Sequence, residues 1–420
     1  MMRFQPKHLF VSNSHHHFGR KIVKRLFLLG IFVSILSNPS HLPAQEPDEL
    51  DRFIGKDDAI LVSDPQGQIL LAKNADKKRI PASILKIFTS LVALHYLGDD
   101  YRFPSEFYLD EQSNLKIKGY GDPLLVSEVI VKISQVLSVL LKNAQPLNDL
   151  VIDDSYFSQP LTIPGISSSS QPYDAPNGAL CVNFNTVNFK NTSRGYVSAE
   201  PQTPLLPFVV RKIKASKLNE GRIVFSHNKN EIAIYAGKLF QYFLEKQGIR
   251  FTGKVKLTRI NTKTDRLIFR YDSAYSLAQI VAKLLEHSNN FTTNQLLIAT
   301  GAEVIGPPGT LAKGVTIARD YARDMLDIED MSIVEGSGIS RDNKVSAAQM
   351  DQVLQEFLPY YYLMRREGRE YYKTGTLYGI STRAGYIKSA HGGLYRYVIM
   401  FNSPNKSTDA LILRLLRILE

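Results

Sequence analysis

The sequence predicts an α+β fold in which one antiparallel five-stranded sheet, flanked by helices, is assembled from both ends of the chain, with an inserted β-rich domain. Two strand-like runs occur early, at 59–63 and 68–72, and three occur late, at 370–376, 382–389 and 394–402. Short alternating runs and prolines fill the region between them. Because period-two apolar patterns bounded by turn residues indicate strands, we expect the early and late groups to pair in one sheet.

Chain length and the change of pattern along the chain indicate two domains. At 420 residues the chain can bury more than one core. The segment 106–268 differs from its flanks in its short strand-like runs, its prolines and a serine-rich stretch at 167–170. We therefore predict a discontinuous domain over 45–105 and 269–420, interrupted by an inserted domain over 106–268.

The first 44 residues have the pattern of an export signal. No acidic residue precedes residue 45, and a basic cluster at 20–25 is followed by the apolar run 26–36. Leu42-Pro43-Ala44 suits cleavage. The sequence thus predicts a signal peptide over 1–44 and a periplasmic protein. An uncleaved anchor stays open as the alternative, and so does a peripheral association with the membrane.

Composition excludes several classes of protein. The net charge of +11 shows no concentrated basic stripe, so we expect no nucleic-acid partner. Cys181 is the only cysteine, which rules out an intrachain disulfide and is typical of a small core residue. The histidines beyond the leader are too scattered along the chain to suggest a zinc motif: His95, His227, His287 and His391. We expect neither a metal nor an organic cofactor, because the serine chemistry inferred below requires none.

The pattern before residue 100 indicates a helix, a hairpin and a second helix. Residues 46–56 are predicted to be helical, and Pro65-Gln66-Gly67 provides the turn between the first two strands. A strongly apolar helix begins near Pro81, which suits a first helical position, and ends at Gly98.

Further strands and helices are expected in the rest of the chain. Alternating runs predict strands at 114–118 and 150–153, and helical patterns occupy 236–247 and 274–286. A final helix over 408–420 closes the chain.

Three short motifs contain the residue types of serine acyl transfer. In chain order they are Ser83-Ile84-Leu85-Lys86, Ser288-Asn289-Asn290 and Lys373-Thr374-Gly375. Each is weak alone, since Ser-x-x-Lys also begins at Ser113, Ser226 and Ser403. Only Ser83 opens an apolar helix, however, only Ser288 separates two helical runs, and Lys373 lies on a predicted strand. This combination favours an enzyme site over helix caps and surface polar residues.

With these motifs the chain resembles the D-alanyl-D-alanine carboxypeptidase and endopeptidase family, the class C low-molecular-mass penicillin-binding proteins. The likeness covers nearly all of the chain after the leader and includes further stretches: Arg79 to Ser83, Gly121-Asp122-Pro123, Val151 to Phe157, Tyr173 to Asn185 and Gly336 to Arg341. The resemblance implies a β-lactamase/transpeptidase-like fold. It also implies hydrolysis of peptidoglycan stem peptides at their D-Ala-D-Ala ends, endopeptidase action on cross-links, and covalent inhibition by β-lactams.

Residue chemistry and the resemblance together suggest roles for the motif residues. Ser83 would attack the peptide carbonyl, and Lys86 would take its proton if burial or nearby cations lower the lysine pKa. Ser288 is expected to relay a proton to the leaving amine, and Asn290 to hold Lys86 and the substrate. The terminal carboxylate is expected to bind at Lys373, Thr374, Gly375 and Thr376. The resemblance implies an oxyanion hole formed by the backbone NH groups of Ser83 and Thr376.

Two further residues match positions that bind the diaminopimelate side chain of the stem peptide in this family. They are Asp153 and Arg341, for which a strand end and a structural ion pair are the respective alternatives. Asn289 and Tyr378 depart from the family pattern, which leaves the side-chain preference open. The intervals between the motifs are shorter than is usual in relatives with two nested inserts, so we expect one insert.

Two other functions stay open at the level of sequence. A β-lactamase would share the acylation step and differ in how fast water clears the β-lactam adduct. A cell-wall-binding module that had lost its chemistry would bind peptide without releasing D-Ala. The intact motif set favours the carboxypeptidase.

Overall fold

The computed structural model describes residues 52–390 and 392–419. The predicted signal peptide lies outside this part of the chain. So does most of the helix predicted over 46–56, and the described end of that segment, 52–56, forms turns instead of a helix. Among the described residues, no helix combines the length and the apolar composition that crossing a membrane requires.

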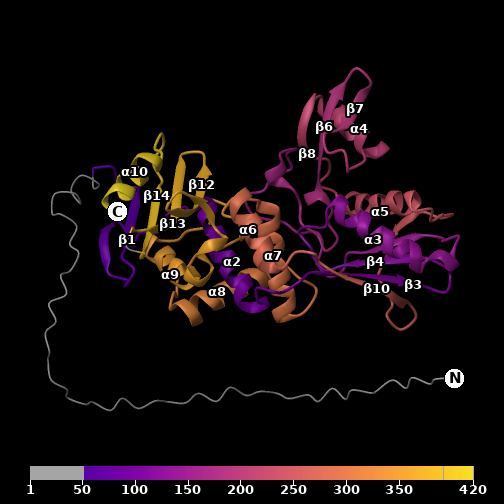
Figure 1. The fold of residues 1–420 in the computed structure, drawn as a ribbon, viewed down its shortest axis with the longest axis horizontal. Coiled ribbons are helices and arrows are strands. Elements are labelled where there is room, and N and C mark those ends of the chain that lie inside the picture. The colour runs from indigo at the N-terminus through magenta and orange to yellow at the C-terminus, as the bar shows by residue number, and fades with distance from the viewer. Residues whose placement is uncertain (1–51, 391, 420) are drawn as a thin grey trace, which may run out of the picture. The chain divides into compact units, whose positions relative to one another are not determined.

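Both ends of the chain contribute to one antiparallel sheet. Its strands, in spatial order, are β11 (Arg365–Glu367), β12 (Glu370–Leu377), β13 (Ile380–Lys388), β14 (Leu394–Phe401), β1 (Ala59–Ser63) and β2 (Ile69–Lys73). In Figure 1 the indigo β1 lies beside the yellow-orange β14, and the two pair antiparallel. The α+β fold and the five predicted strands are confirmed. The sixth strand, β11, is three exposed residues with no apolar alternation that could have predicted it.

Strand alternation gives this sheet two buried faces. Along β1, Ala59 and Leu61 belong to one apolar cluster, whereas Ile60 and Val62 belong to another. Because successive side chains of a strand point to opposite faces, each face needs its own cover. The C-terminal helix α10 (Asp409–Ile418) packs on the second cluster, and α2 (Leu85–Leu97) and α9 (Ala347–Phe357) pack on the first.

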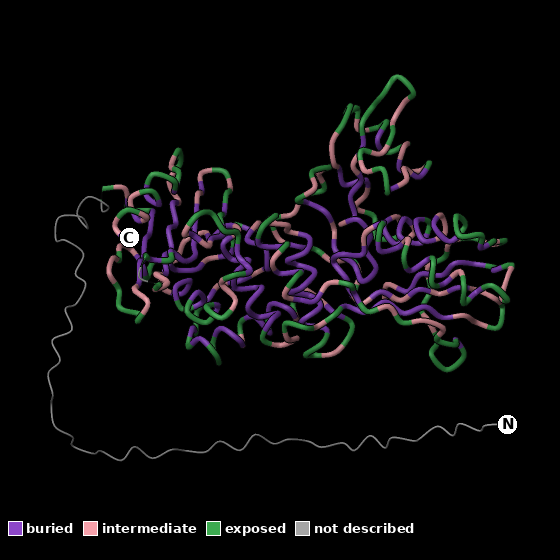
Figure 2. Tube along the Cα trace, viewed as in Figure 1, coloured by how far each residue is buried: buried purple, intermediate pink, exposed green. Residues whose placement is uncertain are grey.

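Helix α2 is a buried member of a layer of helices. Its other members are α6 (Leu277–His287), α7 (Asn290–Ile305) and α8 (Leu311–Leu326), and the short helix η5 (Leu358–Leu363) follows α9. Helix α7 is buried from Phe291 to Ala302, which appears as the purple tube of Figure 2. Close packing against α8 depends on glycine, because a Cβ at Gly301 would lie 2.5 Å from the backbone N of Gly314.

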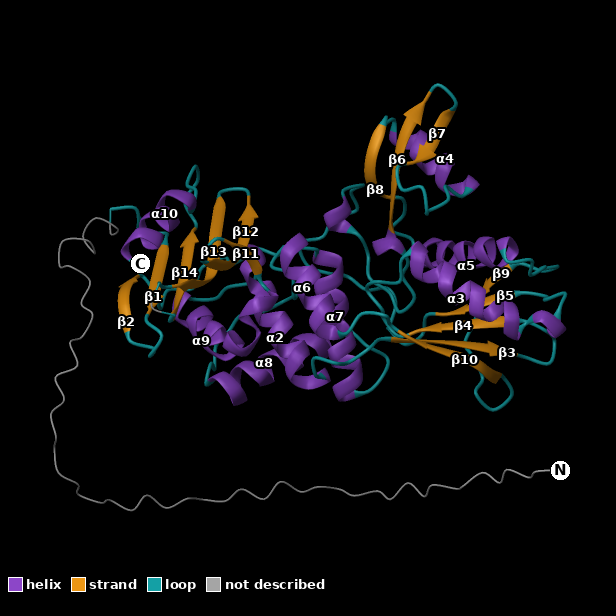
Figure 3. Cartoon of the chain, in the orientation of Figure 1, coloured by secondary structure: helices purple, strands orange, loops and turns teal. Residues whose placement is uncertain are grey.

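The middle of the chain forms two further sheets. A five-stranded sheet has the order β10 (Arg266–Asp272), β3 (Pro104–Leu109), β4 (Leu115–Gly119), β5 (Leu150–Asp153) and β9 (Val255–Leu257). A three-stranded sheet has the order β7 (Gly195–Ser198), β6 (Thr186–Thr192) and β8 (Glu220–Val224). Three helices accompany them in this segment, drawn purple in Figure 3: α3 (Ser127–Leu140), α4 (Pro207–Ser216) and α5 (Lys229–Lys246).

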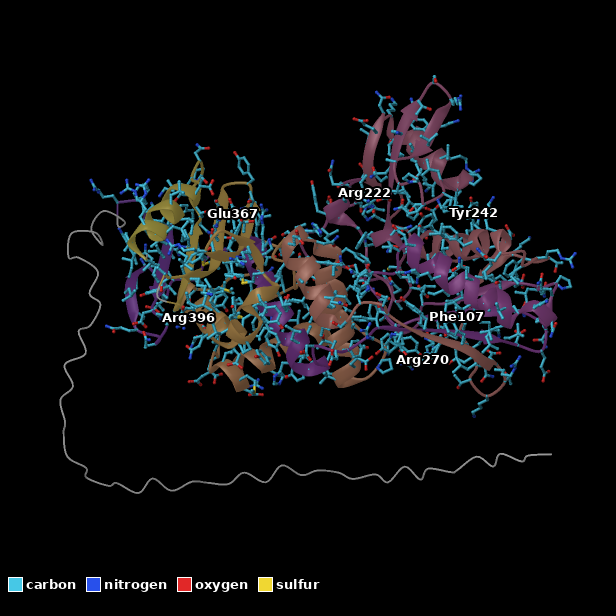
Figure 4. All side chains as sticks on the ribbon, viewed as in Figure 1. Phe107, Arg222, Tyr242, Arg270, Glu367 and Arg396 are labelled. Atoms are coloured by element: carbon cyan, nitrogen blue, oxygen red, sulfur yellow. The ribbon has the colours of Figure 1, made fainter. Side chains whose placement is uncertain are left out.

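One apolar cluster joins these two sheets. Phe107 of β3, labelled in Figure 4, contacts the ring of Phe240 of α5 with centroids 5.7 Å apart. Val187 and Phe189 of β6 belong to the same buried cluster as Phe107. The three-stranded sheet therefore has no separate core of its own among the described residues.

Candidate active site

Ser83 and Lys86 lie at the start of the helix that the sequence predicts. Ser83 belongs to the short 3-10 helix η1 (Ala82–Ile84), which leads directly into α2. Lys86 Nζ lies 2.8 Å from Ser83 Oγ, and the Lys86 side chain is fully buried. Ala82, just before Ser83, has a φ of 49°, a value that costs energy for a residue with a Cβ. The backbone is thus held in a strained turn beside Ser83.

Two carbonyl-type oxygens also contact Lys86. Its Nζ lies 2.8 Å from Asn290 Oδ1 and 2.6 Å from the backbone oxygen of Ser337. The orientation of the Asn290 amide follows from its other contact, because Nδ2 donates to the backbone oxygen of Tyr173 at 3.4 Å. Asn290 therefore presents its oxygen, an acceptor, to Lys86.

The second motif forms the turn between α6 and α7. Ser288 ends α6 in the left-handed conformation with φ 56°, and Asn289 caps α7 by accepting a hydrogen bond from the backbone N of Thr292. A non-glycine residue with positive φ is uncommon and persists where the surroundings enforce it. This turn brings Asn290, the first residue of α7, to Lys86.

The third motif lies on β12 against η1. A Cβ at Gly375 would lie 2.6 Å from the backbone N of Ser83, so the two segments are in close contact. Thr382 of β13 donates from Oγ1 to the backbone oxygen of Pro81 at 2.7 Å and ties the same segments together. Lys373 is 3% exposed and donates to the backbone oxygen of Thr374 at 2.7 Å. Thr374 and Thr376 alternate with these buried residues and are exposed.

Both lysines of the site have lowered pKa values. Burial lowers the pKa of Lys86 well below its usual value, and the charge of Lys373 lowers it further, while the Glu335 carboxylate acts in the opposite direction. Burial and then the charge of Arg365 lower the pKa of Lys373 to about 8. A lysine whose pKa approaches neutrality can release its proton under ordinary conditions, as a general base requires.

Arg341 and Asp153 occupy different surroundings. Arg341 is exposed and donates from Nη2 to the backbone oxygen of Tyr378, at the turn that follows β12. Asp153 ends β5 in the five-stranded sheet and is buried, and its carboxylate accepts from the backbone N of Ser155 and of Ile260, both at 2.9 Å. Arg341 thus borders the Lys373 strand, whereas the carboxylate of Asp153 contacts the backbone just beyond β5 and β9.

Sequence reasoning missed two contributors to this site. Ser337, whose backbone oxygen contacts Lys86, appears in the sequence analysis only within the stretch Gly336 to Arg341 that carries the resemblance, with no role at the site. Glu335, two residues earlier, is fully buried and accepts hydrogen bonds from that turn. The available signal was an acidic residue that follows the apolar pair Ile333-Val334 and immediately precedes the glycines.

A cavity of about 560 Å³ adjoins the turn between α6 and α7. Asn289 and Thr292 line it from the start of α7, and Phe184, Ile280 and Leu284 supply much of its apolar wall. Ser83 and Lys86 are not among its lining residues. The cavity is therefore a neighbour of the serine–lysine pair and does not contain it.

Comparison with known proteins identifies the family of the chain. The model of the D-Ala-D-Ala carboxypeptidase 3 (S13) family matches residues 48–219 and 220–359. The D-alanyl-D-alanine carboxypeptidase of Actinomadura sp. strain R39 is 23% identical over 85% of this chain and 80% of its own length. D-alanyl-D-alanine carboxypeptidase DacB of Haemophilus influenzae is 21% identical over 80% of this chain and 83% of its own length.

Solved structures share the fold. Penicillin binding protein 4 (dacB) of Haemophilus influenzae superposes with a TM-score of 0.70 at 20% identity, covering 88% of this chain and 97% of that one. The same protein in complex with a novel β-lactam gives a TM-score of 0.66 at 19% identity, with the same coverage. The family predicted from the three motifs is confirmed. The chain belongs to the D-Ala-D-Ala carboxypeptidase 3 (S13) family and is a serine-type D-Ala-D-Ala carboxypeptidase.

Proposed function

We propose that Ser83 is the nucleophile of this carboxypeptidase and that neutral Lys86 is its general base. Ser83 Oγ attacks the carbonyl of the penultimate D-Ala, its proton passes to Lys86, and an ester forms on Ser83. The terminal D-Ala leaves as a free amino acid after its nitrogen gains a proton. Water then cleaves the ester and regenerates the hydroxyl.

The arrangement of acceptors around Lys86 Nζ carries this proposal. A neutral amine has two N–H donors and one lone pair, whereas an ammonium has three donors and none. Asn290 Oδ1 and the Ser337 carbonyl can only accept, so they take the two N–H groups. In the proposed neutral form the lone pair then faces Ser83 Oγ, which lies 2.8 Å from Nζ and is the partner able to donate a proton.

Ser288 and Asn290 complete the proposed proton path. Ser288 lies on the turn immediately before Asn290, and we assign to it the relay of the proton from Lys86 to the leaving amine. Asn290 holds the Lys86 amine through Oδ1, as its contact distance supports. The NH groups of Ser83 and Thr376 are assigned to the oxyanion, an arrangement favoured by the close packing of Gly375 on Ser83.

The substrate is proposed to lie along β12. Strand β11 pairs only with residues 370–372 of β12, while β13 pairs with all of it. Among the described strands, nothing pairs with the outer edge of 373–377, so an extended peptide can hydrogen-bond there. Lys373 then supplies the cation for the terminal carboxylate, with Thr374, Gly375 and Thr376 beside it.

Contacts of Arg341 and Asp153 with the stem peptide remain part of the proposal. The position of Arg341 beside the turn after β12 supports a contact with a substrate on that strand. Asp153 has less support, because backbone amides occupy both of its carboxylate oxygens.

The substrates are proposed from the family and the site, and the location of the protein from its first 44 residues. We propose peptidoglycan stem peptides ending in D-Ala-D-Ala as substrates, endopeptidase action on cross-links, and β-lactams as acylating inhibitors. The β-lactam complex of the Haemophilus influenzae relative supports the last assignment. A periplasmic protein with its signal peptide over 1–44 is proposed from the sequence pattern.

Intact-mass analysis with benzylpenicillin tests the proposal. Wild-type protein should gain one penicillin mass, and the Ser83→Ala variant should gain none. D-Ala release from a D-Ala-D-Ala peptide should be lost in the same variant. Absence of an adduct on wild type, or an equal adduct on both proteins, would refute the assignment of Ser83. Rapid loss of the adduct with penicillin turnover would instead indicate a β-lactamase.

A further inference from the structure

Glu335 is a buried carboxylate surrounded by hydrogen-bond donors. Its Oε1 accepts from the backbone N of Gly338 at 2.7 Å and of Ser340 at 3.3 Å, and from Asn343 Nδ2 at 2.6 Å. Its Oε2 accepts from the backbone N of Ser337 at 2.7 Å, from Ser337 Oγ at 2.7 Å and from Asn294 Nδ2 at 3.1 Å. An ionised carboxylate accepts from all of these groups, whereas a protonated one would direct a proton at a donor.

These bonds fix the loop 335–340 that supports the serine–lysine pair. The backbone oxygen of Ser337 is one of the two carbonyl acceptors on Lys86 Nζ. A Cβ at Gly338 would lie 1.9 Å from the backbone oxygen of Ala82, so this loop also packs directly behind η1. The loop therefore touches the pair from two sides, at the amine and at the strained residue before Ser83.

We propose that Glu335 is a positioning residue of the acylation step: it holds the 335–340 loop so that Ser337 orients the Lys86 amine, and its negative charge acts on that amine. The inference rests on the proposed roles of Ser83 and Lys86. It assigns Glu335 no contact with substrate. Its effect passes through the loop backbone and through the electric field at Lys86.

The negative charge of Glu335 and the hydrogen bonds of its carboxylate should affect Lys86 in separable ways. The charged groups that act on Lys86 are Lys373 from β12, which lowers its pKa, and Glu335, which raises it. Lys373 in turn is influenced by Arg365 of β11. Removing the negative charge alone should therefore shift the titration of Lys86 to lower pH, whereas withdrawing the carboxylate oxygens alone should misplace the loop.

Three variants separate these contributions. Glu335→Gln removes the charge and keeps the side-chain length. Glu335→Asp keeps the charge and shortens the side chain by one methylene. Ser337→Ala removes one hydrogen bond to the carboxylate and keeps both the charge and the Ser337 backbone oxygen.

Two measurements are made on each variant. The first is the rate of acylation by benzylpenicillin as a function of pH. The second is the titration of Lys86, followed by NMR of lysine labelled at Nζ, with the Lys86→Met variant identifying the signal. Glu335→Gln should slow acylation by roughly 10²-fold, because small misplacements of reacting groups cost about that much, and should shift the Lys86 titration and the acid limb of the rate to lower pH. Glu335→Asp should slow acylation without that shift, and Ser337→Ala should leave the titration in place.

The Lys86 titration decides the inference even without an acylation signal. If Glu335→Gln titrates Lys86 at the wild-type pH, or acylates at the wild-type rate, the positioning role is wrong. Should Glu335→Gln not fold, an unchanged acylation rate in folded Glu335→Asp overturns the proposal equally. Failure of the wild type to form an adduct would refute the Ser83 assignment and would leave the NMR comparison to decide on Glu335.

Discussion

Lys86 and Lys373 are both buried lysines, but burial serves a different purpose in each. For Lys86 a depressed pKa favours the free amine that its proposed role as a base needs, and three oxygens lie within hydrogen-bond distance of Nζ. In its proposed role Lys373 must carry its charge to bind a carboxylate, so the same burial opposes that role. On this proposal the site keeps a cation in an unfavourable place for the sake of recognition.

A stability gain is predicted for Lys373→Met. Lys373 has a pKa of about 8 in the folded protein, against an ordinary value near 10.4 in the unfolded chain. Between these two pKa values the unfolded chain binds more protons than the folded protein, so the free energy of unfolding rises with pH. The destabilisation that Lys373 causes is therefore greatest below pH 8 and disappears above about pH 10. At pH 7 the variant should gain up to about 3 kcal/mol in free energy of unfolding, measured by urea denaturation.

The gain in free energy of unfolding of Lys373→Met should fall as pH is raised from 8 to 10. The KM of this variant for a peptide with a free carboxylate should be higher than that of wild type. In wild type the same KM should rise above about pH 8, as Lys373 loses its charge. A variant no more stable than wild type at pH 7 would contradict the buried-cation argument.

At the scale of elements, β12 must approach η1 closely. The contact uses a glycine because a side chain at position 375 would meet Ser83 N and Thr382 Oγ1. One cation holds the base of the strand in place, since the guanidinium of Arg383 pairs with Glu370 and lies over the ring of Tyr372. The strand is thus fixed on both sides of Lys373.

Gly375→Ala should therefore impair acylation more than folding. Its Cβ would lie 2.6 Å from Ser83 N and force β12 away from η1. We expect the benzylpenicillin acylation rate to fall by roughly 10²-fold and stability by about 1–3 kcal/mol. Gly237→Ala is the matched control, because its Cβ would crowd Val255 and Ile152 in the middle segment. Equal losses of acylation rate in the two variants would argue against a specific η1 contact.

Most elements with strong periodicity were predictable from the sequence. Strands β1 and β5 match their predicted bounds, and α6 matches within three residues at its start. Helices α3 and α4 were missed, since the short runs and prolines around them favoured strands. The first motif predicted that Ser83 and Lys86 lie together, because two residues three apart at the start of one helix share a face. For Glu335 the sequence offers only an acidic residue between an apolar pair and a glycine-rich turn, and the hydrogen bonds behind its proposed role form only in the folded chain.

At the scale of the molecule, the middle segment combines two sheets with one apolar cluster. The shared cluster supports the single insert expected over 106–268, because neither sheet buries its apolar face alone. We propose that this segment folds as one unit. The exposed tip between β6 and β7, at 190–194, offers a protease an accessible site within it.

Limited proteolysis should cut at that tip without releasing a folded fragment. The nicked halves should stay together in gel filtration and separate only in denaturant. A soluble, folded fragment covering β6 to β8 on its own would show two independent inserts and overturn the single-unit proposal.

The pairing of β1 with β14 has a consequence for the order of events during synthesis. Ser83 and Lys86 are synthesised early, but the sheet beside η1 lacks β14, the strand that pairs with β1, until residues 394–401 have left the ribosome. A nascent or prematurely terminated chain therefore contains Ser83 in a segment without its complete sheet. We expect a chain that ends before β14 to form no benzylpenicillin adduct, so that hydrolysis would begin only after the last strand has paired.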